Sequence, residues 1–348
     1  MLDIQTLGRE SPPLQSFYWP PVGSFNKFAP ELDHFLGLSM TEQRARLADL
    51  RPDQDAHGRF LHKCLSAIYA YIFGYRDSPC HLAADDELEV RLQRAKISLE
   101  REMLEHFLRP EPVPQGLDIR AACDYLRDHV AHNAGVAHPF FDFLRDEAGL
   151  AAYREFLRID VIRNEVVDDE VALITVGLQG LMKKVMTSNL WDECGNGNLA
   201  GFHTYWLRRL LEHTGDWEGL EVYRRDKAPW FAGITSNSLN MLLTRPGYKY
   251  RAYGHFLVTE GWVAPHFERV VAGLQRVGLR HRDITVYFTA HLRIDPHHTD
   301  EMLEGLLYQQ PALTQREIDE IILGAHSAAS AGVHMYDRML SHLKSIAC

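Results

Sequence analysis

The chain has 348 residues, of which 46% are hydrophobic and 24% charged, enough to bury one large core or two smaller ones. Its formal charge of −10 argues against a nucleic-acid-binding protein, which needs a basic face to contact phosphates. The five cysteines are widely spaced without a CxxC pair, which fits a reducing cytoplasm and argues against disulfides or a thiolate zinc site. The sequence has no secretion signal and no apolar segment of membrane length, so we expect a cytoplasmic protein without membrane partners.

The N-terminal third predicts an arm followed by helices. Residues 1–30, rich in Pro, Ser and aromatic residues, predict an extended arm. Apolar residues at three-to-four spacing behind an acidic first turn predict an amphipathic helix over 84–108. Three prolines at 110–114 end this helix and form the predicted linker. We therefore expect an N-terminal arm and helical extension (1–114) and a helical bundle (115–348).

The remaining chain is predicted to be helical as well. Helices are expected over 118–132, 148–190, 199–213, 250–279 and 313–342. The segment 284–289 (ITVYFT) has strand-forming residues but helical neighbours and no partner strand, so we predict the buried start of a helix there. The predicted fold class is all-α.

A first group of metal-ligating residues is His291, Asp295 and His298, spaced by four and three residues. On a helix they share one face, and two imidazoles with one carboxylate suit iron. Alternatively, Asp295 and Pro296 begin a helix as N-cap and first residue, which would leave His291 outside it. If the helix instead continues through Pro296, the missing backbone donor predicts a kink or a partly ordered segment.

A second group pairs Glu193 with His203 across Gly195 and Gly197. In a straight helix these two residues would lie about 15 Å apart, too far to share a metal cluster. The glycines offer a break that would fold His203 back toward Glu193. The alternative is an ordinary glycine C-cap, with the histidine on the next helix by chance.

A third group is acidic: Glu165 and Asp169 are four residues apart, with Asp160, Asp168 and Glu170 nearby. Most such runs form a solvated helix face, and a carboxylate facing the bundle interior is costly unless it binds metal or is paired. The sequence does not decide which acid faces inward. Three acids and three histidines would set three negative charges against the four positive charges of two ferrous ions, and would leave positions open for dioxygen and substrate.

Together these stretches resemble the haem-oxygenase-like diiron oxidases and oxygenases, a family also described as iron-containing redox enzymes. The resemblance covers about residues 138–310. The matching elements are Asn164–Glu165, Asp192–Gly197 with His203, Tyr253–Leu257 leading to Glu260, and the HxxxDxxH pattern from His291 to His298.

The resemblance implies a seven-helix bundle whose inner helices hold two iron ions. The ligands that it implies are Glu165, Glu193, His203, His291, Asp295 and His298. Asp160 and Asp169 remain alternatives to Glu165, because matching Glu165 to the family requires a short insertion. Glu260 resembles a recurrent family acid and is expected near the site without binding metal.

The resemblance also implies a dioxygen-activating oxidoreductase with Fe²⁺/Fe³⁺ as cofactor, dioxygen as co-substrate, a small-molecule substrate and an electron donor. The favoured reaction is N-oxygenation of an amine or amino-acid-derived substrate in specialised metabolism, because Asp192–Gly197 resembles the N-oxygenating branch. Oxidative carbon–carbon cleavage or decarboxylation is one alternative. Others are a metal-free, thiaminase-like hydrolase, with Cys194 as its only candidate nucleophile, a binding protein, and a haem-binding oxygenase. A homodimer formed through residues 1–114 stays open.

Two arginines beside a Pro–Gly turn, Arg245 and Arg251, are predicted to occupy exposed loop positions, with binding of a substrate carboxylate as the alternative. His138 is predicted to start a helix or to pack in the core, and is not expected to bind metal.

Overall fold

The computed structural model describes residues 30–73 and 85–347, and the predicted N-terminal arm lies almost wholly outside them. Regular structure in the described residues is helical apart from one isolated bridge between Cys194 and Phe202. The predicted all-α class is therefore confirmed. No helix in these ranges is long and apolar enough to cross a lipid bilayer.

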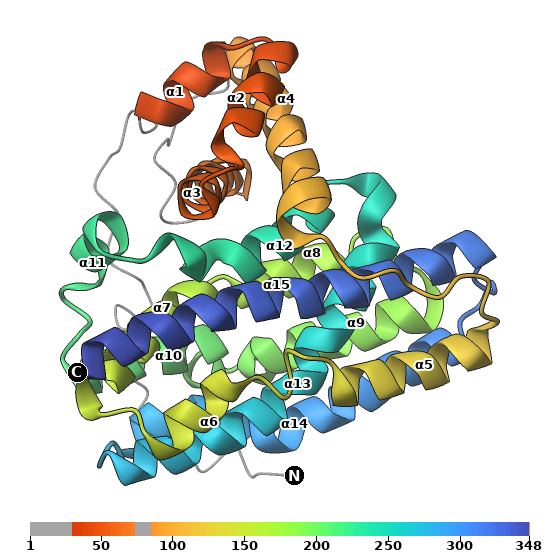
Figure 1. The fold of residues 1–348 in the computed structure, drawn as a ribbon. Coiled ribbons are helices and arrows are strands. Elements are labelled where there is room, and N and C mark those ends of the chain that lie inside the picture. Colours follow the sequence, from red (N-terminus) through yellow and green to blue (C-terminus); the bar gives the residue numbers. More distant parts are fainter. Residues whose placement is uncertain (1–29, 74–84, 348) are drawn as a thin grey trace.

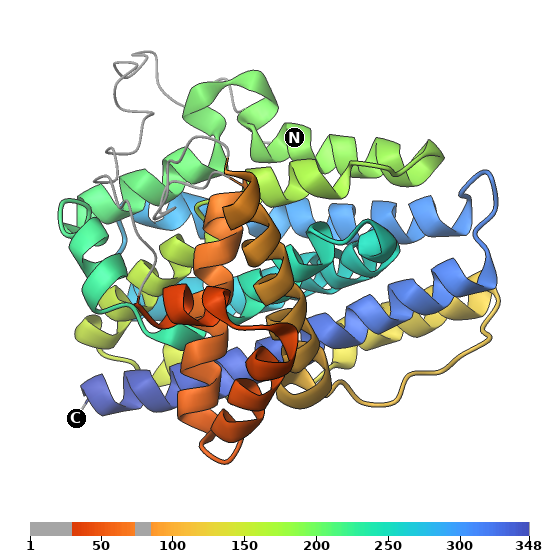
Figure 2. The same cartoon turned by 90° about the horizontal axis from the view of Figure 1, so that it is seen from above.

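The N-terminal helices come first in the chain. They are α1 (Pro30–Gly37), α2 (Met40–Leu50), α3 (Gln54–Phe73) and α4 (Asp86–Glu102), which continues as a π-helix (Met103–Leu108). The expected helix over 84–108 is thus present, with Asp85 as its N-cap. The two views in Figures 1 and 2 place these helices on one side of the molecule, where they run across the long helices of the bundle.

The bundle follows after an irregular segment at 109–118 that holds the predicted proline linker. Its first helices are α5 (Ile119–His132), α6 (Pro139–Asp146), α7 (Leu150–Asn164), α8 (Val167–Ile174), α9 (Gly180–Glu193) and α10 (His203–Thr214). Its later helices are α11 (Leu220–Asp226), α12 (Ile234–Leu243), α13 (Lys249–Arg276), α14 (Arg282–Leu307) and α15 (Gln315–Ala347). Short 3-10 turns lie at Gly195–Gly197, Leu199–Gly201, Trp230–Gly233 and Pro246–Tyr248.

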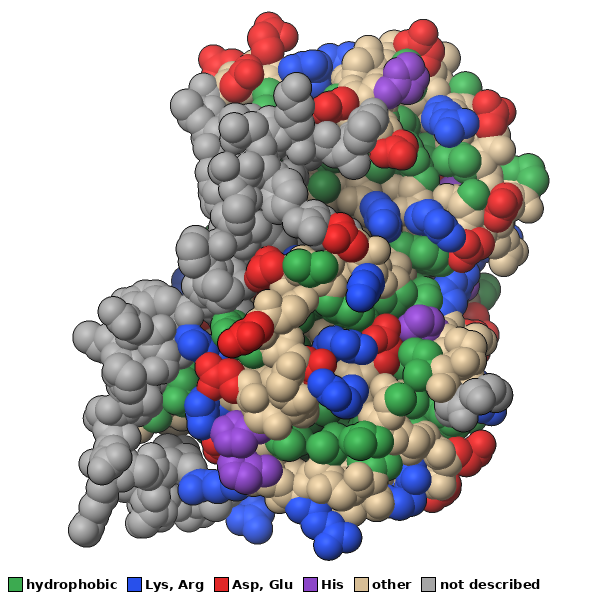
Figure 3. Space-filling model, turned by 90° about the vertical axis from the view of Figure 1, so that its left-hand side faces the viewer, with side chains coloured by type: hydrophobic (Ala, Val, Ile, Leu, Met, Phe, Trp, Pro, Cys, Tyr) green, Lys and Arg blue, Asp and Glu red, His purple; other side chains and the backbone are tan. Residues whose placement is uncertain are grey.

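The long helices set the centre of the molecule. Helix α13 packs against both α14 and α15, and α14 also packs against α9 and α10 (Figure 1). The N-terminal helix α3 packs on α12 and on the turn at Trp230–Gly233. On the face shown in Figure 3, acidic and basic side chains are interspersed over the described residues.

The segment predicted to be a helical run over 148–190 is interrupted twice and forms three helices, α7, α8 and α9. At the first break the side-chain amide of Asn164 donates to the backbone carbonyl of Asp160 (2.9 Å), which competes with the helical ladder. At the second break Gly177 adopts a left-handed φ of 79°, which cannot continue a right-handed helix.

Helix α14 includes the ITVYFT segment, as predicted, and stays helical through Pro296. The kink or partly ordered segment expected at this proline stays a prediction. Pro296 lies on the exposed face of α14, where water can satisfy the carbonyl that lost its helical donor.

Glu102, at the end of α4, joins three N-terminal helices and generates a pH prediction. Its carboxylate accepts hydrogen bonds from Nε and Nη2 of Arg51 (2.7 and 2.8 Å) and lies 3.0 Å from Nε2 of His57. Burial opposes ionisation, but Arg51 and His57 lower the pKa of Glu102 to about 2. A carboxyl group with a lowered pKa stabilises the fold above its unfolded pKa, and this contribution is lost as the pH falls toward 2.

We predict that Glu102→Gln lowers the free energy of unfolding at pH 7 by about 1–2 kcal/mol, less than the full shift because Arg51 is partly exposed. It should also flatten the fall in stability between about pH 4.5 and 2 in denaturant titrations. Glu105→Gln, at an exposed position one turn onward, is the control and should change neither. An unchanged acid profile for Glu102→Gln would contradict this account.

Candidate metal centre

A first triad of metal-ligating side chains consists of Glu193, His203 and His291. Glu193 ends α9, His203 begins α10 and His291 lies in the middle of α14. One ligand atom from each lies within 4.8 Å of those of the other two, and all three residues are buried. Sequence positions nearly a hundred residues apart thus meet at one point inside the bundle.

The chain reversal between α9 and α10 forms this triad. Cys194 pairs with Phe202 in an antiparallel bridge, so that the chain turns back on itself. Gly195 takes a φ of 56°, and a Cβ atom there would lie 2.3 Å from the carbonyl carbon of Gly201. The predicted glycine break is therefore present, and it brings Nδ1 of His203 to 2.8 Å from Oε2 of Glu193.

A second triad consists of Glu260 from α13 and Asp295 and His298 from α14, with one ligand atom from each within 4.8 Å of the others. Together with His291 of the first triad, Asp295 and His298 occupy one buried face of α14. The alternative in which Asp295 starts a new helix is wrong, because α14 begins at Arg282.

The first triad contains buried polar atoms without partners. Oε2 of Glu193 and Nδ1 of His203 lie 2.8 Å apart, yet neither makes a hydrogen bond within the described chain. Buried groups of this kind are costly unless something satisfies them. A carboxylate oxygen and an imidazole nitrogen that face one point are the donors that a transition-metal ion takes, so the residues present fit a metal.

Two of the histidines are held in the orientation that metal binding requires. Nδ1 of His291 donates to the carbonyl of Tyr287 (2.6 Å), which leaves Nε2 free to bind. Nε2 of His298 lies 3.0 Å from Oδ2 of Asp192, while its Nδ1 faces Glu260 at 3.2 Å. Carbonyl and carboxylate partners of this kind orient histidine ligands and raise their basicity.

The charges of the site are tightly linked. Burial lowers the pKa of His291 to about 3, so that its imidazole is neutral, the form that binds metal. Burial and the neighbouring Glu260 raise the pKa of Asp295, and burial raises that of Glu260. Burial disfavours a charge on His298, but Asp192 and Glu260 raise its pKa to about 11. Glu260 thus disfavours ionisation of Asp295, and a bound divalent cation would offset this repulsion.

Glu193 has a lowered pKa although burial by itself would raise it, because His203 lies beside its carboxylate. The charge of Glu193 in turn contributes to the raised pKa values of Glu260 and Asp295. The two triads are therefore electrostatically coupled, and members of both line the same cavity.

Glu165, predicted as the first acidic ligand, belongs to neither triad. It caps the C-terminus of α7, and its Oε2 accepts a hydrogen bond from Nη2 of Arg224 (2.7 Å). Asp169, one alternative, is exposed. Asp160, the other, accepts a hydrogen bond from Asn164. The structure therefore brings together five of the six predicted residues and sets Glu260 in the place expected for Glu165.

The sequence places Glu260 near the site but not among the expected ligands, and it does not single out Asp192 as a partner of His298. The signal at Glu260 is its surroundings, because it is the one acid in the apolar stretch Phe256–Val263. A lone carboxylate on the buried face of a helix is costly and therefore indicates a bound cation or a partner. Nothing in the spacing of Asp192 predicts its contact with His298.

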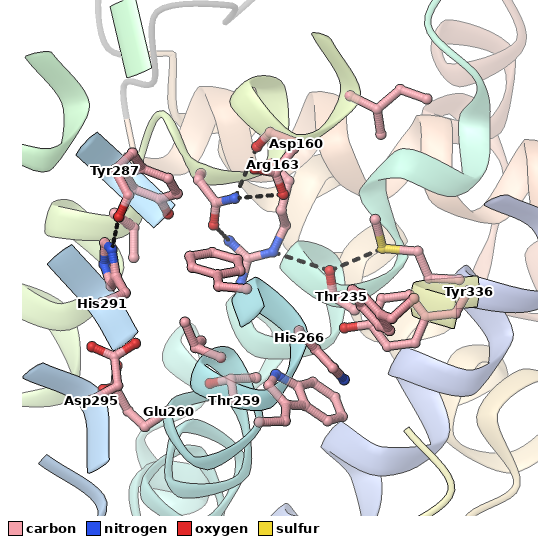
Figure 4. A pocket seen from close by; sticks show the side chains of 18 of the residues that line it. Asp160, Arg163, Thr235, Thr259, Glu260, His266, Tyr287, His291, Asp295 and Tyr336 are labelled. Atoms are coloured by element: carbon pink, nitrogen blue, oxygen red, sulfur yellow. Dashed lines mark hydrogen bonds between the residues drawn. The ribbon is translucent and has the colours of Figure 1, made fainter. Parts of the chain in front are cut away.

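A cavity of about 120 Å³ adjoins the two triads (Figure 4). Glu193, Glu260, His291 and Asp295 line one part of it, and aromatic side chains form much of the remaining wall. Cys194 does not line this cavity. The arginines considered from the sequence lie elsewhere, since Arg245 pairs with Glu100 and Arg251 with Glu320.

A third histidine-containing group, His213, His281 and Asp283, lies at the surface. Arg209 donates to Oδ2 of Asp283 (3.0 Å), and Nδ1 of His281 accepts the backbone N–H of Asp283 (3.2 Å). These atoms are already satisfied within the chain, so we do not assign this group to a metal. His138 is the N-cap of α6, as predicted.

The described residues form a helical bundle with a buried carboxylate–histidine site beside a small cavity, an arrangement typical of helical bundles that hold metal ions. Residues 154–333 match the family described as iron-containing redox enzymes, and the chain belongs to this family. No curated protein matches the chain.

The chain is also similar to two crystal structures of a CADD-like protein of unknown function from Nostoc punctiforme PCC 73102. In the structure at 1.35 Å resolution the identity is 16% and the TM-score 0.50, over 66% of this chain and 98% of that chain. In the structure at 2.00 Å the values are 17% and 0.51, over 65% and 99%. The likeness shows that the fold is haem-oxygenase-like, as the sequence predicts.

The reversal at Gly195 gives a testable consequence for metal binding. We predict that Gly195→Ala weakens binding of ferrous iron at the triad of Glu193, His203 and His291 about tenfold or more, because the added Cβ would push Gly201 and thus His203 away from Glu193. Anaerobic calorimetric titration would measure the affinity. Gly215→Ala is the control, since Gly215 also has a positive φ (76°) but open space around it. Equal iron affinity in the two variants would contradict the role of the reversal.

The contact between Asp192 and His298 gives a second prediction. Asp192→Ala should weaken binding of ferrous iron at the triad of Glu260, Asp295 and His298 by about 10- to 100-fold, because His298 loses the carboxylate that orients it. Asn196→Ala removes only the amide that donates to Oδ1 of Asp192 (3.1 Å). This variant should bind ferrous iron with nearly the affinity of the parent chain. The same titration measures the affinity, and unchanged iron binding in Asp192→Ala would exclude this role.

Proposed function

We propose that this chain is a non-haem diiron oxygenase that uses dioxygen to oxidise a small molecule bound in the cavity. One iron ion would bind the triad of Glu193, His203 and His291, and the other the triad of Glu260, Asp295 and His298. The observation that carries the proposal is the meeting of two buried carboxylate–histidine triads at one cavity, in a chain of the iron-containing redox enzyme family.

The donor set suits two ferrous ions. Three carboxylates offset three of their four positive charges, and three protein ligands for each ion leave positions open. When bound, the irons supply the electrons that reduce dioxygen at a site next to the substrate. The imidazoles of His203 and His291 complete the first triad, and the Tyr287 carbonyl keeps the ring of His291 turned toward it.

The surrounding residues protect such chemistry from water. Phe256, Trp262 and Phe267 are buried and line the cavity, together with Tyr287. Exclusion of water strengthens electrostatic interactions within the site and limits side reactions of the oxidant. The cavity volume of about 120 Å³ limits the substrate to a small molecule, since a cavity of roughly 150 Å³ holds benzene.

The reaction that we favour is N-oxygenation of an amine or amino-acid-derived substrate. In this reaction R–NH₂, O₂, two electrons and two protons give R–NHOH and H₂O, so that a C–N bond is kept and an N–O bond forms. The ferrous ions and an external electron donor would supply the electrons. The choice over oxidative carbon–carbon cleavage is supported by the resemblance of Asp192–Gly197 to the N-oxygenating branch.

The hydrolase alternative has little support in the geometry. It needs a cysteine thiol in the pocket, but Cys194 does not line the cavity, and burial raises the pKa of its thiol. A thiol with a raised pKa is a poor nucleophile near neutral pH.

Iron loading and product analysis test the proposed function. The full chain loaded anaerobically should bind about two ferrous ions, Glu260→Ala about one, and Glu165→Ala still two. On exposure to dioxygen with a panel of small primary amines and amino acids, mass spectrometry should detect a hydroxylamine. Turnover only to cleaved carbon products would reject N-oxygenation, and a parent chain that binds no iron would reject the diiron site.

A further inference from the structure

The cavity has a second polar region that neither triad uses, formed by Asp160, Arg163 and Asn164 of α7, Glu170 of α8 and Thr235 of α12. In Figure 4, Arg163 and Thr235 lie on one side of the cavity, whereas His291, Asp295 and Glu260 lie on another. Arg163 is the single lysine or arginine among the described residues that line the cavity. A cation in this position calls for an explanation.

The guanidinium group of Arg163 is fixed by its neighbours. Its Nε donates to Oγ1 of Thr235 (3.0 Å), and its Nη1 faces Oδ1 of Asn164 (3.4 Å) and Oε2 of Glu170 (3.3 Å). Its remaining terminal nitrogen, Nη2, makes no hydrogen bond within the described ranges. Hydrogen bonds along one edge of the guanidinium group therefore hold it in place. The two N–H groups of Nη2 can still donate to a ligand.

The two acids beside Arg163 do not offer an equivalent site for a cation. Oδ2 of Asp160 and Oε1 of Glu170 are buried atoms without a hydrogen-bond partner, although both residues line the cavity. Burial also raises the pKa of each acid to about 7, so that part of their negative charge is absent near neutral pH. The charge of Arg163 is thus only partly offset.

We propose that Arg163 binds a carboxylate group of the substrate through Nη2, at the side of the cavity away from the two triads. The proposal rests on the function proposed above and narrows its substrate to a small carboxylic acid. A guanidinium fixed by neighbouring hydrogen bonds binds a carboxylate with little loss of side-chain entropy. The aromatic wall then contacts the apolar part of the substrate, and the end opposite its carboxylate is directed to the metal centre.

The test uses three six-carbon probes of similar length, hexanoate, hexan-1-ol and hexylamine, with the full chain. Calorimetry should find that the metal-free chain binds hexanoate about 10- to 100-fold more tightly than hexan-1-ol, with hexylamine weakest. Arg163→Gln should abolish the preference for hexanoate over hexan-1-ol. The control is Arg269→Gln, whose arginine lies on α13, pairs with Asp142 and does not line the cavity, and it should keep the preference.

Two further variants guard against misfolding of Arg163→Gln, which leaves Glu170 buried without its cation. The double variant with Arg163→Gln and Glu170→Gln also removes the charge of Glu170 and should lack the preference for hexanoate. Arg163→Lys should keep part of this preference. Equal preference in the parent chain and the double variant would overturn the proposal, as would tighter binding of hexylamine than hexanoate.

Iron loading separates this proposal from the proposed function. The same titrations with anaerobically iron-loaded chain should show the same dependence on Arg163. Hexanoate binding that needs iron and ignores Arg163 would mean that the metal centre binds the carboxylate, which overturns the proposal. A chain that binds no iron but discriminates hexanoate through Arg163 would overturn the diiron function alone.

Discussion

The structure depends on the burial of three carboxylates beside three histidines in the interior of a helical bundle. Moving an ionised carboxylate from water into an apolar core costs several kcal/mol unless a cation or hydrogen bonds offset it. Glu193, Glu260 and Asp295 are all buried, and the last two have raised pKa values as a result. A fold that keeps three such groups together bears a cost that bound metal ions would remove.

Helix α14 organises the site, because it supplies one residue to the first triad and two to the second. Because His291, Asp295 and His298 lie on one face, the rotation of α14 about its own axis fixes the direction of all three side chains. The other ligands approach from two directions, Glu193 and His203 through the α9–α10 reversal and Glu260 from α13. The packing of α14 against α9, α10 and α13 is therefore what fixes the geometry of the centre.

The sequence predicts those parts of the site that depend on local spacing. The shared face of His291, Asp295 and His298 follows from helix periodicity, and the return of His203 toward Glu193 follows from the glycines between them. Their assignment as iron ligands stays a prediction. Contacts between distant segments are not encoded in spacing, so the pairing of Glu165 with Arg224 could not be derived, and only the family resemblance placed Glu260 near the site. The break between α7 and α8 was also missed, because it depends on an Asn164 side chain that turns back onto its own helix.

The central claim is that two irons occupy the two triads. Crystals of the full chain grown anaerobically with ferrous iron would reveal each iron by anomalous scattering at its absorption edge. The account predicts two peaks, one among Glu193, His203 and His291 and the other among Glu260, Asp295 and His298. A single peak, no peak, or an iron bound at Glu165 would contradict it.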